Sequence, residues 1–254
     1  DGEAYSQGVT NPSTEWTIMF QAGCTTMAAW ANAANCAMLA EAFRIHGDEG
    51  LCSYYTEEAA KAYRYAEKQE WTQLDDLQNI GTSGMRGRDF KQMAAAFLYN
   101  LTGERSWEDV MALESVVKDG KSPVFSKQGR NQFYQIWGTA AYLTCPHERH
   151  YPELYANMKS SVNHQADENN VNHMYARPSR RTANDPRWQT SQNLQMVMLA
   201  HYIADNSERR SRLEAAMYIE AGWGLGRNPA NIVEMTGLGE RHIVDCYTTG
   251  RNDG

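Results

Sequence analysis

The chain has 254 residues, 42% of them hydrophobic and 11% aromatic, which is enough apolar material for a full core and excludes a largely disordered chain. Asp and Glu outnumber Lys and Arg by 31 to 24, so the net charge of −7 provides no basic field that would attract nucleic acid. No apolar run approaches the ~18–20 residues that a membrane span needs. The five cysteines include no Cys-x-x-Cys pair, so the sequence indicates neither a zinc knuckle nor a dense disulfide scaffold.

Apolar residues recur three and four positions apart along most of the chain, which predicts amphipathic helices. Gly47 and Gly103 are expected to end two of them, and Ser53 or Thr56 is expected to cap the start of a third. Ser106 is expected to cap a fourth. The expected helices cover residues 15–45, 53–71, 88–101, 107–118, 132–143, 151–165, 190–203 and 207–223. Because alternating runs of β-branched residues are few, the expected class is all-α.

These roughly eight helices are expected to pair into four consecutive hairpins within a single domain over residues 1–254. The connections within the pairs are short, whereas those between the pairs are long and carry aromatic and Arg residues. Loops of about a dozen residues or more are usually functional or disordered. The long linkers cover residues 72–87, 119–130, 166–187 and the chain from 225 onward. The pattern predicts a toroid of helical hairpins with a cleft at the end where the long linkers emerge.

The segment 167–193 has the chemistry of carbohydrate recognition. It combines aromatic side chains with Asn, Arg, Gln and His, and it ends in WQTSQN at residues 188–193. Sugars offer flat C–H faces to aromatic rings and hydroxyl groups to hydrogen-bonding side chains. The alternative is a solvated loop in which Trp188 anchors the core, and composition alone favours neither strongly. Trp107 and Trp137 lie in helical apolar stripes and are expected in the core.

Several motifs resemble those of glycoside hydrolase family 9, the family of cellulase-type endo-β-1,4-glucanases. WQTSQN is followed by LGRNP at residues 225–229 and TGLG at 236–239, where the family has a Trp-Gly-Ser helix start, a Leu-Gly-x-Asn-Pro turn and a Gly-Phe-Gly element. LYNLTG at residues 98–103 is similar to the family's Leu-Tyr-x-x-Thr-Gly helix end. The resemblance runs over about residues 5–254. It implies the C-terminal two-thirds of an (α/α)6 barrel of about twelve helices.

The resemblance implies inverting hydrolysis of β-1,4-glucosidic bonds in cellulose or related β-glucans. Inversion requires a carboxylate base and a carboxylic acid roughly 6.5–9.5 Å apart. The family's Asp-rich base motif and its acidic Glu are not found in these 254 residues. The chain is therefore expected to be a fragment of the catalytic domain, with the acid and base outside it and its catalytic residues unknown. The alternative is a non-catalytic, carbohydrate-binding helical toroid that lacks this pair.

The resemblance also implies substrate-binding residues at the cleft. Trp188 matches the family's sugar-stacking Trp, Gln192 stands where the family often has an Arg, and Arg251 matches the Arg of the family's His-His-Arg loop. The loop before Trp188 is expected to add further sugar contacts from His173, Tyr175 and Arg177. The histidines show no metal-ligand spacing, so no metal-binding residue is assigned.

No cofactor is implied, but the resemblance leaves a structural calcium ion open. Asp89 matches one carboxylate of the family's calcium site, whereas Phe90 replaces the adjacent acid and removes an oxygen ligand. The expected partner is a β-glucan polysaccharide or oligosaccharide. Because such a polymer cannot cross a membrane, the protein is expected to be secreted or attached to the cell surface.

Overall fold

The computed structural model describes residues 26–69, 86–126, 133–169, 194–228, 231–233, 235, 237–242, 246–248 and 251–253. Within these ranges the helices are α2 (Thr26–His46), α3 (Glu49–Lys68), α5 (Gly87–Thr102), α6 (Arg105–Glu114), α7 (Ile136–Leu143), α8 (Pro152–Asn169), α9 (Leu194–Tyr202) and α10 (Ser207–Gly224). The expected all-α class is confirmed. None of these helices is both long enough and apolar enough to cross a membrane.

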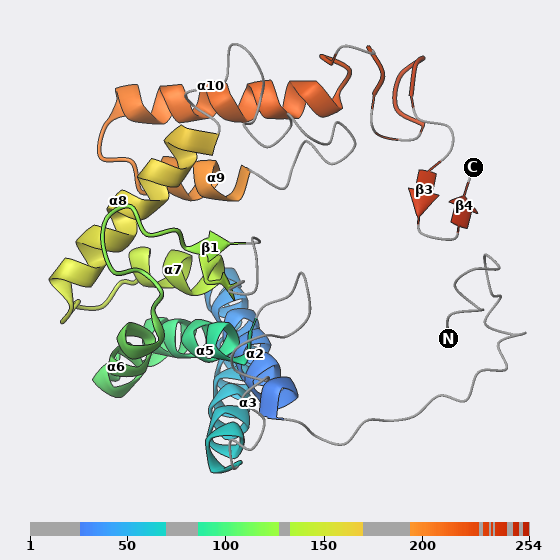
Figure 1. Cartoon of the computed structure of the whole chain (residues 1–254). Coiled ribbons are helices and arrows are strands. Elements are labelled where there is room, and N and C mark those ends of the chain that lie inside the picture. The colour runs from blue at the N-terminus through green and yellow to red at the C-terminus, as the bar shows by residue number, and fades with distance from the viewer. Residues whose placement is uncertain are drawn as a thin grey trace, which may run out of the picture.

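Consecutive helices pair as hairpins, as the spacing of apolar residues predicted. Figure 1 shows the pairs following one another along an arc, from α2 and α3 to α9 and α10. α5 packs against both α2 and α7, while α9 packs against α8 and α10. Within pairs, the connections cover residues 47–48, 103–104, 144–151 and 203–206; between pairs, they cover 69–86, 115–135 and 170–193. The expected alternation of shorter and longer connections is therefore confirmed for these helices.

Two helix ends agree closely with the sequence prediction. Gly103 ends α5 in the left-handed conformation, with φ of 69°, and its N–H donates to the carbonyl of Tyr99 at 2.8 Å. Glycine adopts this conformation without the strain that a Cβ would bring. At the start of α10, the side chain of Asn206 accepts a hydrogen bond from the N–H of Arg209 at 2.8 Å. This bond satisfies one of the unpaired N–H groups of the first turn.

The predicted start of α3 was wrong. The helix begins at Glu49 rather than near Ser53 or Thr56, because Asp48 caps it. Its Oδ1 accepts a hydrogen bond from the N–H of Leu51 at 2.9 Å. Asp is as effective a cap as Ser or Thr, so the earlier candidate in the chain forms the cap.

Both predicted ends of α6 were wrong as well. The helix begins at Arg105, which places Ser106 inside the first turn, and it ends at Glu114. Ser115 is already extended, and the N–H of Val116 donates to Oε1 of Gln135 at 2.9 Å. A hydrogen bond that the backbone donates to a distant side chain therefore accompanies the end of α6, before the apolar pattern ends.

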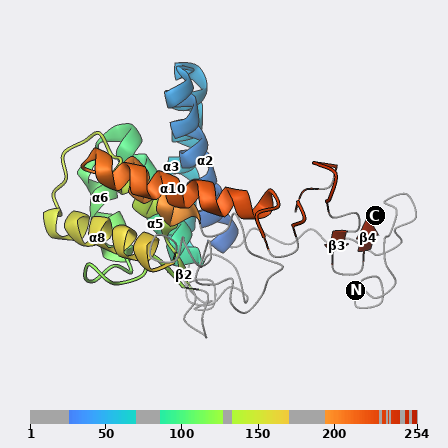
Figure 2. The same ribbon diagram turned by 90° about the horizontal axis from the view of Figure 1, so that it is seen from above.

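In the described residues, two small strand pairs accompany the helices. β1 (Phe125–Ser126) pairs antiparallel with β2 (Phe133–Tyr134), so the helix expected over 132–143 begins only at Ile136. β3 (Cys246–Thr248) pairs antiparallel with β4 (Arg251–Asp253). Figure 2 shows β3 and β4 beyond the end of α10, away from the helices.

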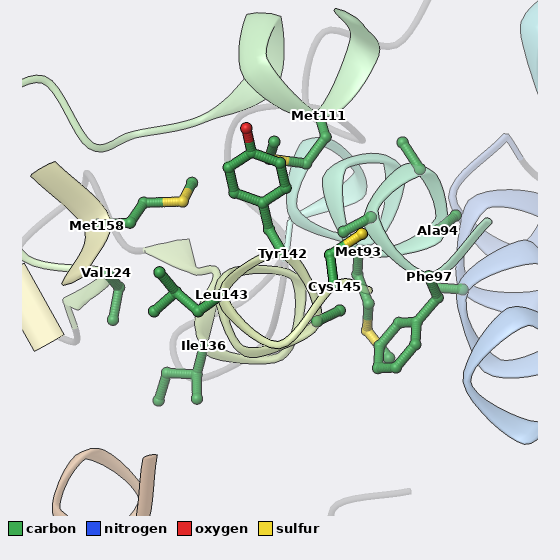
Figure 3. Close-up of a cluster of buried hydrophobic side chains, with 14 of the residues drawn as sticks. Met93, Ala94, Phe97, Met111, Val124, Ile136, Tyr142, Leu143, Cys145 and Met158 are labelled. Carbon is green, nitrogen blue, oxygen red and sulfur yellow. The ribbon is translucent and has the colours of Figure 1, made fainter. Parts of the chain in front are cut away.

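The core lies within and between the hairpins. α2 contributes a stripe of small buried residues together with Trp30, whose ring meets that of Tyr63 from α3 edge-on, with 4.6 Å between centroids. Tyr63 in turn meets Trp107 of α6 at 4.8 Å, which confirms that Trp107 packs against the core. A second group of buried apolar side chains joins α5, α6, α7 and α8 (Figure 3). Trp137 differs from the prediction, because it is 39% exposed at the start of α7.

Candidate functional site

The starts of α5, α7 and α9 define one end of the hairpins. Each of the longer connections brings the chain to the start of one of these helices, and each shorter connection joins a pair at its other end. We call the end where α5, α7 and α9 begin the rim. The rim is the part of the structure to compare with the predicted cleft, because the long linkers emerge there.

Asp89 is the main polar anchor of the rim. It lies in the first turn of α5 with its side chain fully buried. Its Oδ1 accepts hydrogen bonds from Nη2 of Arg86 at 2.7 Å and Nε2 of Gln135 at 3.1 Å. Its Oδ2 accepts from the backbone N–H of Tyr134 at 2.9 Å and from that of Arg86 at 3.0 Å. One carboxylate thus fastens α5 to β2 and to the residue before α7.

Tyr134 continues this connection to α9. Its hydroxyl group donates to Oε1 of Gln195 at 2.6 Å, although the two residues are 61 positions apart. Burial raises the pKa of Tyr134, and the hydrogen bond to Gln195 partly offsets this effect. The phenol therefore stays protonated and can donate throughout the neutral range. Gln195 is the second residue of α9, so β2 and the first turn of α9 are in direct contact.

The LGRN segment that follows α10 forms a turn held by one amide. Nδ2 of Asn228 donates to the carbonyls of Trp223 at 2.8 Å and Ile232 at 2.7 Å, while its Oδ1 accepts from the N–H of Ile232 at 3.3 Å. Gly226 has φ of 101°, a conformation open to glycine. A side chain with both a donor and an acceptor is required for this pattern, which gives the Asn of the motif a structural role.

Glu108 is a second buried carboxylate, and it lies away from the rim, near the start of α6. Its Oε1 accepts from the hydroxyl of Tyr142 at 2.7 Å and from the backbone N–H of His150 at 2.8 Å. Burial, followed by the hydrogen bond to Glu108, strongly raises the pKa of Tyr142. Because its oxygens are engaged by protein donors, Glu108 fixes the hairpin ends and is not available as an acid or base.

Of the predicted substrate-binding residues, Trp188, Gln192, His173, Tyr175 and Arg177 lie outside the described residues. For Arg251, the structure describes only the backbone. It is the first residue of β4 and pairs in register with Thr248 of β3. β4 lies apart from the helices in both views (Figures 1 and 2), so the structure does not bring Arg251 next to the rim.

Calcium does not fit Asp89 as it is placed in this structure. Ca²⁺ takes six to eight oxygen ligands, whereas the oxygens of Asp89 face N–H donors from Arg86, Tyr134 and Gln135. The side chain of Phe90 supplies no oxygen. Within the described ranges, moreover, no three His, Cys, Asp or Glu side chains are grouped so that they could hold a metal ion.

The fold and motifs define the class of protein: a ring-forming array of helical hairpins with a rim of long linkers. A model of glycosyl hydrolase family 9 matches residues 7–252 of the sequence. The chain therefore belongs to glycosyl hydrolase family 9, as the resemblance of its motifs predicted. No curated protein matched the sequence.

Solved structures of the same family share the fold. The chain is similar to the GH family 9 endoglucanase J30, with a TM-score of 0.62 and 20% identity over 85% of this chain and 40% of that one. A Bacteroides ovatus GH9 structure has a TM-score of 0.58 at 19% identity, over 86% and 42% of the two chains. A thermostable endoglucanase from Alicyclobacillus acidocaldarius has a TM-score of 0.55 at 19% identity, over 87% and 41%. A zinc-binding triple mutant of J30 matches similarly, with a TM-score of 0.61 at 20% identity, over 85% and 40%.

At these identities the likeness shows the fold, which is part of an (α/α)6 barrel. The chain spans about two-fifths of the length of the solved structures that it matches.

Proposed function

We propose that this chain forms part of an inverting glycoside hydrolase that cleaves β-1,4-glucosidic bonds in cellulose or related β-glucans. Its membership of glycosyl hydrolase family 9, over residues 7–252, is the observation that carries the proposal. Two further findings support an acid and base supplied by residues outside these 254. The family's catalytic motifs do not occur in the sequence, and two of the buried carboxylates, Asp89 and Glu108, are engaged in structural hydrogen bonds.

In this proposal the chain contributes sugar-binding groups at the rim and, through Arg251, from β4 beyond α10 (Figure 2). Trp188 stacks on a glucose ring, and Gln192 and Arg251 donate hydrogen bonds to hydroxyl groups. His173, Tyr175 and Arg177 add contacts from the preceding loop. The bond between Tyr134 and Gln195 supports this arrangement, because Gln195 follows Gln192 by three positions and is held against β2.

Trp137 is a further candidate for sugar stacking. It is the second residue of α7, at the rim, and 39% of it is exposed. An exposed Trp offers an apolar face that a sugar ring can cover. The sequence pattern had predicted a core position for it, so its exposure is a finding of the structure.

A polymeric substrate supports a location outside the cell. Cellulose and related glucans do not pass through a membrane, so an enzyme that shortens them has to meet them on the outer side. We therefore propose that the protein is secreted or attached to the cell surface.

The full-length protein should be incubated with barley β-glucan, xyloglucan and carboxymethyl cellulose, and the products separated by chromatography. The proposal predicts release of oligosaccharides from at least one substrate, with the new reducing end first appearing in the inverted configuration by NMR. No release from any of the three would contradict the glucanase assignment. Binding to a glucan without release would favour the non-catalytic toroid, whose lack of an acid and base pair among these 254 residues is its supporting observation.

A further inference from the structure

The buried carboxylate of Asp89 is fully saturated by donors of the chain itself. Besides Nη2, the Nε of Arg86 lies 3.3 Å from Oδ1 and 3.1 Å from Oδ2. Two backbone N–H groups and the Gln135 amide complete the set. A carboxylate removed from water is strongly destabilising unless a cation and hydrogen bonds compensate it. Here both forms of compensation come from protein groups.

Arg86 is itself held in place. Its side chain is 14% exposed, and its guanidinium carbon lies 5.5 Å from the centroid of the Phe133 ring. A planar guanidinium presents its donors in a fixed fork to the carboxylate and its face to an aromatic ring. The cation is therefore an enclosed part of the rim and not a surface side chain that pairs with Asp89 occasionally.

A calcium ion and this guanidinium exclude each other at Asp89. The ion would need the oxygens that Arg86, Tyr134 and Gln135 now occupy, and it would be repelled by the positive charge of Arg86. The side chain of Phe90 offers no oxygen in compensation. We propose that Arg86 is the built-in counter-cation of Asp89, so that this part of the rim needs no calcium, unlike the calcium site that the family resemblance left open.

The counter-cation has a mechanical consequence for the rim. Gln135 donates from its one Nε2 to Asp89 and to the carbonyl of Glu114 at 2.9 Å, and its Oε1 accepts from Val116. The Asp89 cluster therefore links the start of α5, the end of α6 and β2. Removing the guanidinium leaves a buried, uncompensated charge at the point where these three elements meet. This inference does not depend on what substrate the rim binds.

Thermal unfolding of the full-length protein tests the inference, with the protein first stripped by EDTA and then measured with and without added calcium chloride. Arg86→Gln is expected to lower the melting temperature by on the order of 10 °C, and calcium should not restore it. The matched control is Arg88→Gln. Arg88 also pairs with a carboxylate, Glu114 at 2.9 Å, but its side chain is 50% exposed, so its loss should change the melting temperature by no more than ~2 °C.

Asp89→Asn locates any calcium response. If Arg86 is the counter-cation of Asp89, calcium shifts the melting temperature of Asp89→Asn by as much as that of the wild-type protein. This holds whether or not calcium binds elsewhere on the protein. A shift that is present in the wild type and absent from Asp89→Asn would overturn the inference. If Asp89→Asn does not fold, the melting temperatures of Arg86→Gln and Arg88→Gln in calcium chloride still test the inference. Equal melting temperatures would show that calcium holds the site and would overturn the inference, whereas we expect Arg86→Gln to melt at a lower temperature than Arg88→Gln.

Discussion

Nδ1 of His150 lies 2.6 Å from Oε2 of Glu108, although the two residues are 42 positions apart and Glu108 is fully buried. The same carboxylate receives the hydroxyl group of Tyr142 and the backbone N–H of His150. It thereby ties α6 to α7 and to the connection that leads into α8. The hairpin ends opposite the rim are held by a polar cluster just as the rim is.

Replacing this carboxylate should strongly destabilise the fold. Glu108→Ala leaves a buried tyrosine hydroxyl and two N–H groups of His150 without their acceptor, so we expect a loss of roughly 2–4 kcal/mol in the free energy of unfolding. Urea denaturation followed by circular dichroism measures it. Glu104→Ala is the matched control, because Glu104 precedes the same helix, is exposed and makes no capping bond with its side chain; its effect should stay within about 0.5 kcal/mol. Equal effects of the two variants would contradict this role of Glu108.

Tyr99 should make stability fall at alkaline pH. Burial, followed by the nearby Glu108 carboxylate, raises the pKa of Tyr99 from 10.0 to about 12. The unfolded chain therefore releases this proton near pH 10 and the folded one only near pH 12. Tyr99 therefore contributes roughly 2–3 kcal/mol to the free energy of unfolding below about pH 10, and this contribution is lost as the pH rises to about 12.

Tyr99→Phe isolates this effect from other alkaline transitions. The variant loses the hydrogen bond that the Tyr99 hydroxyl donates to the carbonyl of Glu148, so it should be less stable at neutral pH. Its stability should then decline less than that of the wild type between about pH 9 and about pH 12. Denaturation curves at several pH values measure the difference, and parallel declines would rule out a contribution of Tyr99.

The turn after α10 should depend on Asn228. Asn228→Ala removes two donated hydrogen bonds and one accepted bond, which should cost roughly 1–3 kcal/mol of stability. Limited proteolysis should also cut more readily after α10. Arg227→Ala is the control, since Arg227 is the exposed neighbour in the same motif. If Arg227→Ala has the same effect, the turn is not held by the Asn228 amide.

Substitutions at Gly138 and Gln92 should have strongly non-additive effects on the free energy of unfolding. A Cβ on Gly138 would lie 1.8 Å from Oε1 of Gln92, a side chain that is fully buried. Gly138→Ala should therefore cost roughly 1–3 kcal/mol through overpacking between α5 and α7. In a Gln92→Ala background the same substitution should cost much less, because the obstructing amide is gone. A double-mutant cycle measures this, and additive effects would refute the predicted contact.

The periodic parts of the fold were predictable from the sequence, because a helix leaves a local signature. Gly103 ended its helix and residue 207 began another as predicted, since caps and apolar spacing act over a few residues. The start at Glu49 was missed because Asp48 competed with Ser53 and Thr56 as a cap. The two-residue strands β1 and β2 are too short to show a period.

The polar anchors were less predictable, because their partners are far apart in the sequence. The spacing of Arg86 and Asp89 would allow an ion pair, but nothing local connects Asp89 with Tyr134, 45 positions away. Likewise, no pattern pairs Tyr134 with Gln195. The exposure of Trp137 depends on how α7 sits among its neighbours, and helical spacing alone does not reveal that.

Binding of a β-glucan at the rim is tested most directly by the Kd of a cello-oligosaccharide for the full-length protein, measured by calorimetry. Trp188→Ala should weaken binding ~5–30-fold, the equivalent of roughly 1–2 kcal/mol of lost stacking. Tyr202→Ala should leave the Kd unchanged, because Tyr202 is an exposed aromatic at the last residue of α9, the end of that helix opposite the rim. The same Kd for Trp188→Ala and the wild type would contradict the account.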